Sequence, residues 1–173
     1  MTDAEDVAER VAVTGTPGTG KTTATTLIDG PVVHLNDLIH EEGLWADRDD
    51  DRDSLVADLD AVREALGDWS GVVESHLAHH LDADRVAVLR CRPDVLEERL
   101  RDRGESEASA AENAESEALD VVLSETVDRH GIENVYEVDA TDRTPAEVAD
   151  EIEAVIAGDR APSAGDVDFI DYL

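Results

Sequence analysis

The fold of this chain is decided by the stretch Arg10-Val11-Ala12-Val13-Thr14-Gly15-Thr16-Pro17-Gly18-Thr19-Gly20-Lys21-Thr22. Its first five residues form a short apolar, β-branched run that predicts a buried strand, and residues 22–28 then predict a helix. Between them lies the pattern G-x-x-x-x-G-K-S/T of a phosphate-binding loop. Its glycines let backbone amides point inward, and the helix N-terminus favours negative charge. The stretch therefore predicts a nucleotide phosphate site.

Lys21 is the only lysine in a chain of 173 residues, because every other long basic side chain is an arginine. Its compact ammonium suits a position between backbone amides, within reach of the terminal phosphates of a nucleotide. We expect the hydroxyl of Thr22 to ligate Mg²⁺ beside it. Guanine-specific enzymes usually carry an N-K-x-D element, and with a single lysine this chain has none. Its absence argues against a guanine-specific enzyme.

The composition is that of one ordinary domain with a strongly acidic surface. Hydrophobic residues make up 41% of the chain, while the formal net charge is -30. The acids are spread along the whole sequence, and with the scarcity of lysine this favours adaptation to concentrated salt over a single basic partner. Binding of nucleic acid through a general basic surface is not expected. Cys91 is the lone cysteine, so a packed residue in a reducing cytoplasm is expected.

Strand-like and helix-like segments alternate, which predicts an α/β fold with a parallel sheet covered by helices on both faces. Four further apolar runs complete a five-stranded sheet, at 32–35, 71–74, 85–90 and 134–138. Helices are expected at 37–42, 54–66, 93–103, 115–128 and 145–158. No apolar stretch is long enough to span a membrane, and the acidic N-terminus lacks the basic region of a signal peptide.

The segments between these elements are expected to differ in mobility. Residues 43–53 form a polar connection, and residues 105–113 lack an apolar face and are a candidate mobile segment. The helix 115–128 is expected to bury Leu119 among other apolar residues. Residues 159–173 predict a flexible acidic tail after a kinase-sized domain of residues 1–158, although Phe169 and its neighbours offer docking groups.

Arginines occur where phosphoryl transfer needs positive charge. Arg99 and Arg103 lie four residues apart on one face of a predicted helix, just before the candidate mobile segment. Arg90 and Arg92 stand at the carboxyl end of a predicted strand, on the edge where open α/β sheets bind ligands. Such arginines stabilise the charge of a transferring phosphoryl group. The alternative is that they are surface arginines that balance nearby acids.

A second cluster invites a metal interpretation. His76, His79 and His80 form an H-x-x-H-H run, a spacing that places ligands on one helical face. No further cysteine or histidine lies near enough in the sequence to complete a zinc site. We therefore expect the phosphate loop, and not zinc, to explain the local chemistry.

The combined pattern resembles the small adenylate kinase family shared by archaea and eukaryotic nuclei. The resemblance is carried by the phosphate loop, by Glu74-Ser75-His76, by Val88-Leu89-Arg90 and by Leu96-Glu97-Glu98-Arg99-Leu100-Arg101-Asp102-Arg103-Gly104. It extends from Val11 to about Ile156. It implies a P-loop nucleoside monophosphate kinase fold, with an acceptor segment at about 34–53 and a short lid at about 102–112.

The resemblance also implies site residues. Those that would bind ATP and Mg²⁺ are Gly18, Gly20, Lys21, Thr22, Thr23, Arg103 and Arg143, the last in a loop beside the adenine. Glu74 would lie near the metal through water, and His76 is implicated in ATP hydrolysis. Arg99 would assist catalysis with Arg103. Asp37, His40 and Arg90 would bind the acceptor.

Two residues depart from the family pattern. Position 74 often carries aspartate, so Glu74 keeps the charge but extends it by one methylene. Position 40 often carries an arginine that binds the acceptor phosphate, where this chain has His40. Histidine is neutral or partly charged near pH 7, so acceptor affinity or selectivity is expected to differ.

Two functions follow from the resemblance. The first is phosphoryl transfer from Mg·ATP to a nucleoside monophosphate, AMP before others, by a monomeric enzyme. The second is an ATPase that acts in maturation of the small ribosomal subunit through a ribosomal protein. The sequence supports both, because the same site serves both.

Overall fold

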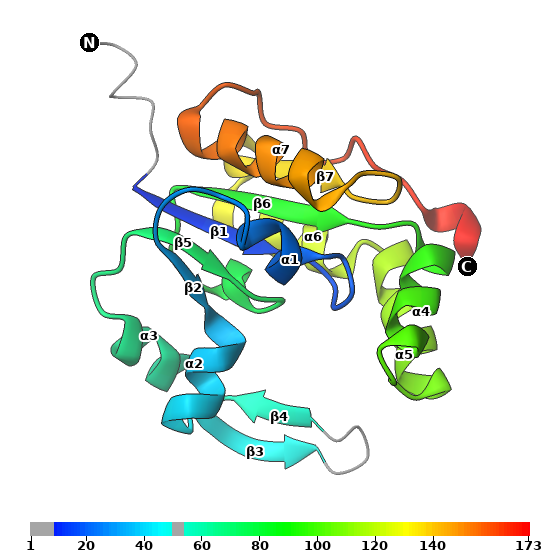
Figure 1. Ribbon diagram of the computed structural model, residues 1–173, viewed down its shortest axis with the longest axis horizontal. Coiled ribbons are helices and arrows are strands. Elements are labelled where there is room, and N and C mark those ends of the chain that lie inside the picture. The colour runs from blue at the N-terminus through cyan, green and yellow to red at the C-terminus, as the bar shows by residue number, and fades with distance from the viewer. Residues whose placement is uncertain (1–8, 50–53) are drawn as a thin grey trace.

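A computed structural model of the chain describes residues 9–49 and 54–173. Its centre is a five-stranded parallel sheet in the order β2-β5-β1-β6-β7 (Figure 1). The strands are β1 (Arg10–Thr14), β2 (Val32–His34), β5 (Gly71–Glu74), β6 (Arg85–Arg90) and β7 (Val135–Asp139). The predicted α/β fold is confirmed. Because β1 is the middle strand, its carboxyl end delivers the phosphate loop to the centre of the ligand-binding edge.

Side chains alternate along the strands and so build a hydrophobic core on each face of the sheet. On β1, Val11 and Val13 face α1 (Lys21–Thr25) and α7 (Pro145–Ala157), whereas Ala12 faces the opposite layer. That opposite layer contains α2 (Leu35–Glu42), α3 (Leu59–Leu66) and α6 (Val121–His130). Figure 1 shows α7 above the sheet and α2 and α3 below it. Short 3-10 turns are η1 (Ala78–His80), η2 (Ile132–Asn134) and η3 (Ile170–Tyr172).

The segment after α2 differs from the prediction. The expected polar connection contains β3 (Trp45–Asp49), which pairs antiparallel with β4 (Ser54–Ala57). Residues 50–53 of that prediction lie outside the described residues. The helix expected from residue 54 begins only at Leu59, because the side chain of Asp58 accepts a hydrogen bond from the amide of Ala61 and caps it.

The candidate mobile segment, residues 105–113, is also more ordered than its composition suggested. After α4 (Pro93–Asp102), α5 (Glu107–Ala118) begins at the cap Ser106 and buries Ala110 completely against α4. Small residues therefore make an apolar face that the sequence pattern concealed.

The single helix predicted at 115–128 is divided. Asp120 adopts a left-handed φ of 57° between α5 and α6, which turns the chain. Leu119, expected in the core, lies at this break and is 48% exposed. Aspartate adopts the left-handed region more readily than most residues, so the chain can turn here without a glycine. The sequence therefore gave no signal for the break.

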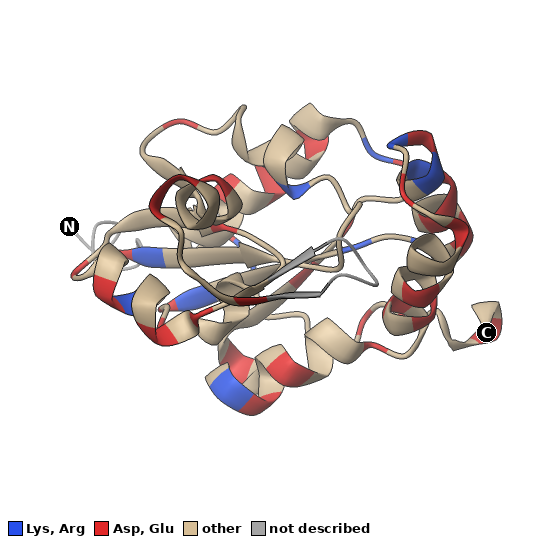
Figure 2. Cartoon of the chain, turned by 90° about the horizontal axis from the view of Figure 1, so that it is seen from below, with Lys and Arg blue, Asp and Glu red and all other residues tan. Residues whose placement is uncertain are grey.

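The C-terminal segment packs on the domain. Ser163 donates its amide to the carbonyl of Val135, and Phe169 is buried with its ring beneath the guanidinium of Arg90. Ile170 and Leu173 remain exposed. Of the docking groups offered by the sequence, Phe169 is the one that is buried. The acidic residues, by contrast, lie over helices on all sides of the view in Figure 2, as expected of a dispersed surface charge.

Candidate active site

The phosphate loop fits closely between β1 and its neighbours, and glycine is required at two positions. A Cβ on Gly15 would lie 2.6 Å from the carbonyl oxygen of Leu89 on β6. A Cβ on Gly18, whose φ is +94°, would lie 2.9 Å from the side chains of Leu96 and Leu100 on α4. The loop therefore depends on close approach of its backbone to β6 and α4.

Lys21 is buried at the start of α1, and its ammonium has neutral acceptors. Nζ donates to the carbonyls of Gly15 (2.9 Å) and Thr16 (3.0 Å) and, at 3.4 Å, to the hydroxyl of Thr19. Burial lowers the pKa of Lys21 to about 8, against the opposing effect of Glu74 and Glu117. Within residues 9–49 and 54–173, no carboxylate pairs with this ammonium, which suits an anionic ligand.

A set of oxygen ligands lies next to the ammonium. The hydroxyl of Thr22 donates to Glu74 Oε1 at 3.0 Å, and His34 Nδ1 lies 2.8 Å from the same oxygen. Glu74 ends β5 and is only 3% exposed. A hydroxyl beside a buried carboxylate is the donor type that Mg²⁺ prefers, so these residues fit that ion.

His76 follows β5 and faces the same space. Burial, with the nearby positive charge of Lys21, lowers the pKa of His76 to about 4. The imidazole is therefore neutral near pH 7.

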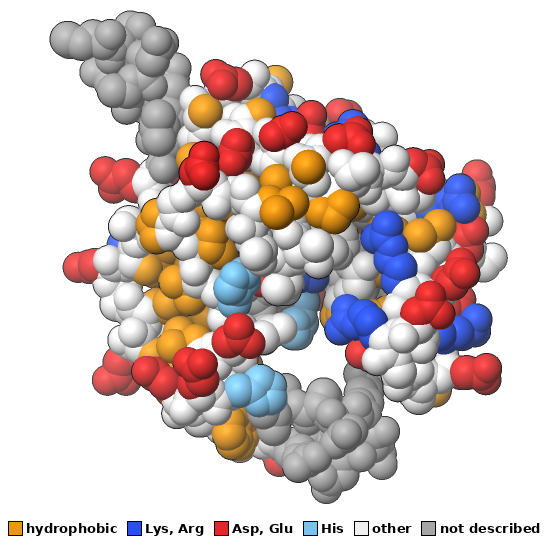
Figure 3. All heavy atoms as spheres, viewed as in Figure 1, with side chains coloured by type: hydrophobic (Ala, Val, Ile, Leu, Met, Phe, Trp, Pro, Cys, Tyr) orange, Lys and Arg blue, Asp and Glu red, His pale blue; other side chains and the backbone are white. Residues whose placement is uncertain are grey.

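Two cavities meet at these residues. The first, of about 140 Å³, is bounded by the phosphate loop, Thr22, Thr23, Glu74 and His76. The second, of about 640 Å³, lies between α2, β4 and α5. Pro17, Asn36, His76 and Arg103 line both. Figure 3 shows the hollow on this face, with histidine side chains along one rim and basic side chains along the other. The volume of the second cavity is that of a small-molecule site.

Comparison with known proteins agrees with this geometry. A family model described as an AAA domain matches residues 11–120. The chain is 66% identical over 167 residues to a protein of Natronomonas pharaonis named "Putative adenylate kinase", covering 95% of this chain and 99% of that protein. Identically named proteins are 58% identical in Halobacterium salinarum, over 95% and 99%, and 43% in Methanothermobacter thermautotrophicus, over 94% and 98%. The chain belongs to the archaeal adenylate kinase family.

A solved structure supports the fold. Shikimate kinase from Bacteroides thetaiotaomicron superposes with a TM-score of 0.52 at 20% identity, covering 85% of this chain and 96% of that one. Within the described residues, no helix has the length and apolarity to span a bilayer.

The expected site residues of this family member fall into two groups. Beside the cavities lie Gly18, Gly20, Lys21, Thr22, Thr23, Glu74, His76, Arg103 and, in the larger cavity, His40. Four others, Asp37, Arg90, Arg99 and Arg143, do not line either cavity. Asp37 is exposed on the first turn of α2. Arg99 donates to the carbonyl of Ala140 at 3.4 Å, and Arg143 pairs with Glu151 at 3.7 Å. These two arginines lie by the loop after β7, where the resemblance places the adenine.

Arg90 is not available to an acceptor, contrary to the prediction. It is 1% exposed, and its guanidinium donates to the carboxylates of Glu117 (3.2 Å), Glu137 (2.7 Å) and Asp120 (2.6 Å). The prediction placed Arg90 correctly at the carboxyl end of β6. It could not place the three acids, which follow 27 or more residues later in the sequence. Together they accept hydrogen bonds from all three nitrogens of the guanidinium.

Three residues of the site escaped the sequence analysis. Asn36 and Pro17 line both cavities, and Glu117 accepts a hydrogen bond from the hydroxyl of Thr16 at 3.0 Å. Pro17 lies inside the phosphate-loop motif and Asn36 lies in the first turn of α2, so their positions in the sequence were the only signal. Glu117 is one of many acids in this chain, and nothing in the local pattern distinguishes it.

Proposed function

We propose that this protein transfers the γ-phosphoryl group of ATP, bound with Mg²⁺, to a nucleoside monophosphate, with AMP as the preferred acceptor. The observation that carries the proposal is the junction of the two cavities at Pro17, Asn36, His76 and Arg103. A phosphate loop that only hydrolyses or senses a nucleotide needs no second cavity for a second nucleotide. The names of the archaeal relatives support AMP as acceptor.

On the donor side, the amides of Gly18 and Gly20 and the ammonium of Lys21 would hold the β- and γ-phosphates. Thr22 and Glu74 would hold Mg²⁺, Glu74 through water, and the ion neutralises phosphate charge when bound. Because Lys21 Nζ now contacts neutral oxygens, phosphate binding would replace weak contacts with charged ones. Thr23 and Arg143 complete the proposed ATP site.

On the acceptor side, α2 and the β3–β4 hairpin border the larger cavity. His40 and Ala57 line it, and the family-pattern arginine at position 40 is absent. The acceptor phosphate would therefore depend more on Arg103, which reaches both cavities. We assign residues 34–53 to the acceptor segment on this basis.

Arg103 ends α4, where the proposed lid of residues 102–112 begins. Its side chain is 58% exposed and lies 4.0 Å from Glu105, so it is not held in a buried pair. Closure over ATP would bring this cation to the transferring phosphoryl group and exclude water. Arg99, also on α4, would approach from the side of the loop after β7, where it donates to the carbonyl of Ala140.

Product analysis tests the proposal. The protein is incubated in molar KCl with Mg·ATP alone, and then with AMP, GMP, CMP or UMP in turn, and products are separated by chromatography. Two ADP formed per AMP consumed is the expected result. Hydrolysis of ATP that no monophosphate changes would reject phosphoryl transfer.

We also propose slow ATP hydrolysis as a second activity. It is supported by His76, whose neutral imidazole faces both cavities and offers a nitrogen that can orient water. The link to small-subunit maturation rests on the family resemblance alone. Capture of a small-subunit ribosomal protein in molar salt, with and without ATP, tests it; no such partner in either state would reject the link.

A further inference from the structure

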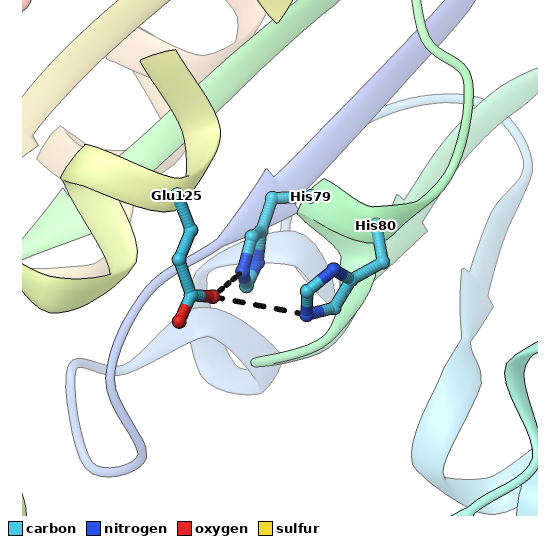
Figure 4. Close-up of side chains that lie close together, drawn as sticks. All are labelled: His79, His80 and Glu125. Carbon is cyan, nitrogen blue, oxygen red and sulfur yellow. Dashed lines mark hydrogen bonds and ion pairs between the residues drawn. The ribbon is translucent and has the colours of Figure 1, made fainter. Parts of the chain in front are cut away.

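A cluster of metal-ligating side chains lies apart from the phosphate loop, on the layer that contains α6. His79 and His80 come from η1, and Glu125 comes from α6. Glu125 Oε2 lies 2.7 Å from His79 Nε2 and 3.8 Å from His80 Nε2. Figure 4 shows the carboxylate pointing at both rings. One ligand atom from each of the three residues lies within 4.8 Å of the others.

Glu125, the third residue of the cluster, is a ligand that the sequence analysis did not consider when it argued against zinc. The run H-x-x-H-H suggested His76 as the partner of His79 and His80, but His76 faces the cavities instead. The residue that joins the pair is Glu125, 45 positions after His80 in the sequence and brought there by the packing of α6 on η1. Spacing could not reveal a ligand from another element.

His79 is oriented as a metal-binding histidine is. Its other ring nitrogen, Nδ1, lies 2.8 Å from the hydroxyl of Thr14 at the end of β1. A hydroxyl both donates and accepts, so in the metal-bound state Thr14 can accept a hydrogen bond from the Nδ1–H group, which leaves the Nε2 lone pair free for the cation. Such a second hydrogen bond fixes the ring and tautomer of metal-bound histidines.

The partly exposed side chains of His80 and Glu125 let an ion reach the site and let the distances between the ligand atoms adjust. His79 itself is only 2% exposed, whereas the side chains of His80 and Glu125 are 32% and 48% exposed. An ion can therefore enter from solvent, and a fourth position stays open to water. Ligand atoms about 2.0–2.1 Å from a tetrahedral Zn²⁺ lie about 3.3 Å apart. The present separations of 2.7 and 3.8 Å bracket that value, and rotation of the exposed Glu125 side chain adjusts both.

We propose that His79, His80 and Glu125 form a binding site for a zinc-class divalent cation, separate from the nucleotide site. Two imidazole nitrogens with one carboxylate oxygen select Zn²⁺ or Co²⁺ over Mg²⁺, which prefers oxygen ligands alone. The hydroxyl and carboxylate of Thr22 and Glu74 have the opposite preference. The bound cation would tie α6 to the turn that follows β5.

The experiment uses untagged full-length protein in molar KCl, without nucleotide and after treatment with a chelator. Zn²⁺ binding is measured by calorimetry, and Co²⁺ binding by its visible absorption. The test variants are His80→Ala and Glu125→Gln. Both side chains are partly exposed, and glutamine can still accept the hydrogen bond from His79. The matched control is His76→Asn, which removes the other histidine of the run.

We expect one Zn²⁺ per chain, intense Co²⁺ absorption typical of four-coordination, and at least about tenfold weaker binding in each test variant. The His76→Asn control should bind as the wild type does, and thermal unfolding should shift upward with Zn²⁺ in wild type and control only. Equal affinity in the wild type and both test variants would overturn the proposal. So would loss of binding in His76→Asn alone, which would place the ion at the phosphate loop.

Discussion

Two buried cations lie at the carboxyl ends of neighbouring strands, and their surroundings are opposite. Arg90, at the end of β6, is matched by three carboxylates and stacks over Phe169. Lys21, at the start of α1, donates to two carbonyls and a hydroxyl, and to no carboxylate of the described residues. The net attraction of its acids raises the pKa of Arg90, whereas burial lowers that of Lys21. We infer that Arg90, whose charge is neutralised by carboxylates, stabilises the fold. Lys21, whose hydrogen-bond acceptors are neutral, keeps its charge for an anionic ligand.

The largest expected effect is that of replacing Lys21, which should abolish most of the activity without lowering the stability of the fold. Replacement Lys21→Met should lower kcat/KM for ATP and AMP by about 10³–10⁵-fold, the range for loss of a cation that stabilises a transferring phosphoryl group. Unfolding by urea should show unchanged or higher stability, because a buried ammonium with no carboxylate partner is removed. Coupled assays and equilibrium denaturation in molar KCl measure the two. A strongly destabilised variant would remove the contrast.

The complementary replacement is Arg90→Met. It leaves Glu117 and Glu137 buried without their cation, so the free energy of unfolding should fall by about 3–5 kcal/mol. Urea denaturation in molar KCl measures it. The matched control is Arg101→Met, because Arg101 pairs with Glu97 on the exposed face of α4 and should change stability by at most about 1 kcal/mol. Equal stability of the two variants would show that the Arg90 network is not structural.

Between these extremes stands Arg103, an exposed cation that reaches both cavities. Arg103→Ala should lower kcat/KM by about 10²-fold, since one charge near the transferring group is lost while the fold is kept. Arg101→Ala, two residues earlier on the same helix, should stay within about twofold of wild type. Steady-state kinetics at several ATP concentrations measure both. Matching losses in the pair would indicate a general charge effect.

The smallest effect concerns pH. The pKa of His76 in the folded protein is about 4, below its ordinary value near 6.5. Between these values the unfolded chain takes up a proton that the folded chain does not, so stability falls as pH drops from 6.5 to 4. The contribution is on the order of 2 kcal/mol. Urea unfolding at pH 7 and pH 4.5 should show a smaller difference for His76→Asn than for wild type; identical differences would refute the shift.

The sequence predicted best where a signal is local. The strands, the phosphate loop and the capped helix α7 follow from short runs, glycines and the box formed by Thr144 and Glu147. The β3–β4 hairpin was missed because Leu55, Leu59, Val62 and Leu66 have the spacing of one helical face, which predicted a helix from residue 54. The break at Asp120 carries no glycine or proline to mark it. In both places tertiary packing decided between patterns that fit equally well.

For the site, the sequence identified groups but not their partners. The phosphate-loop pattern predicted Lys21 and Thr22, and the family resemblance added Glu74 and His76; all four line one cavity. The sequence could not show that Arg90 is buried among carboxylates, whereas Arg103 is exposed and lines both cavities. That distinction depends on acids from α5 and β7, whose approach is a property of the folded chain.

Nucleotide affinity tests the central claim most directly. Mg·ATP is titrated into folded wild type and into Lys21→Met by calorimetry in molar KCl, with circular dichroism to verify folding. Saturable binding at one site per chain in the wild type is expected, with at least about a hundredfold weaker binding in the variant. A folded wild type that binds no Mg·ATP, or a variant that binds it equally well, would contradict the claim that the Lys21 ammonium is held for phosphate.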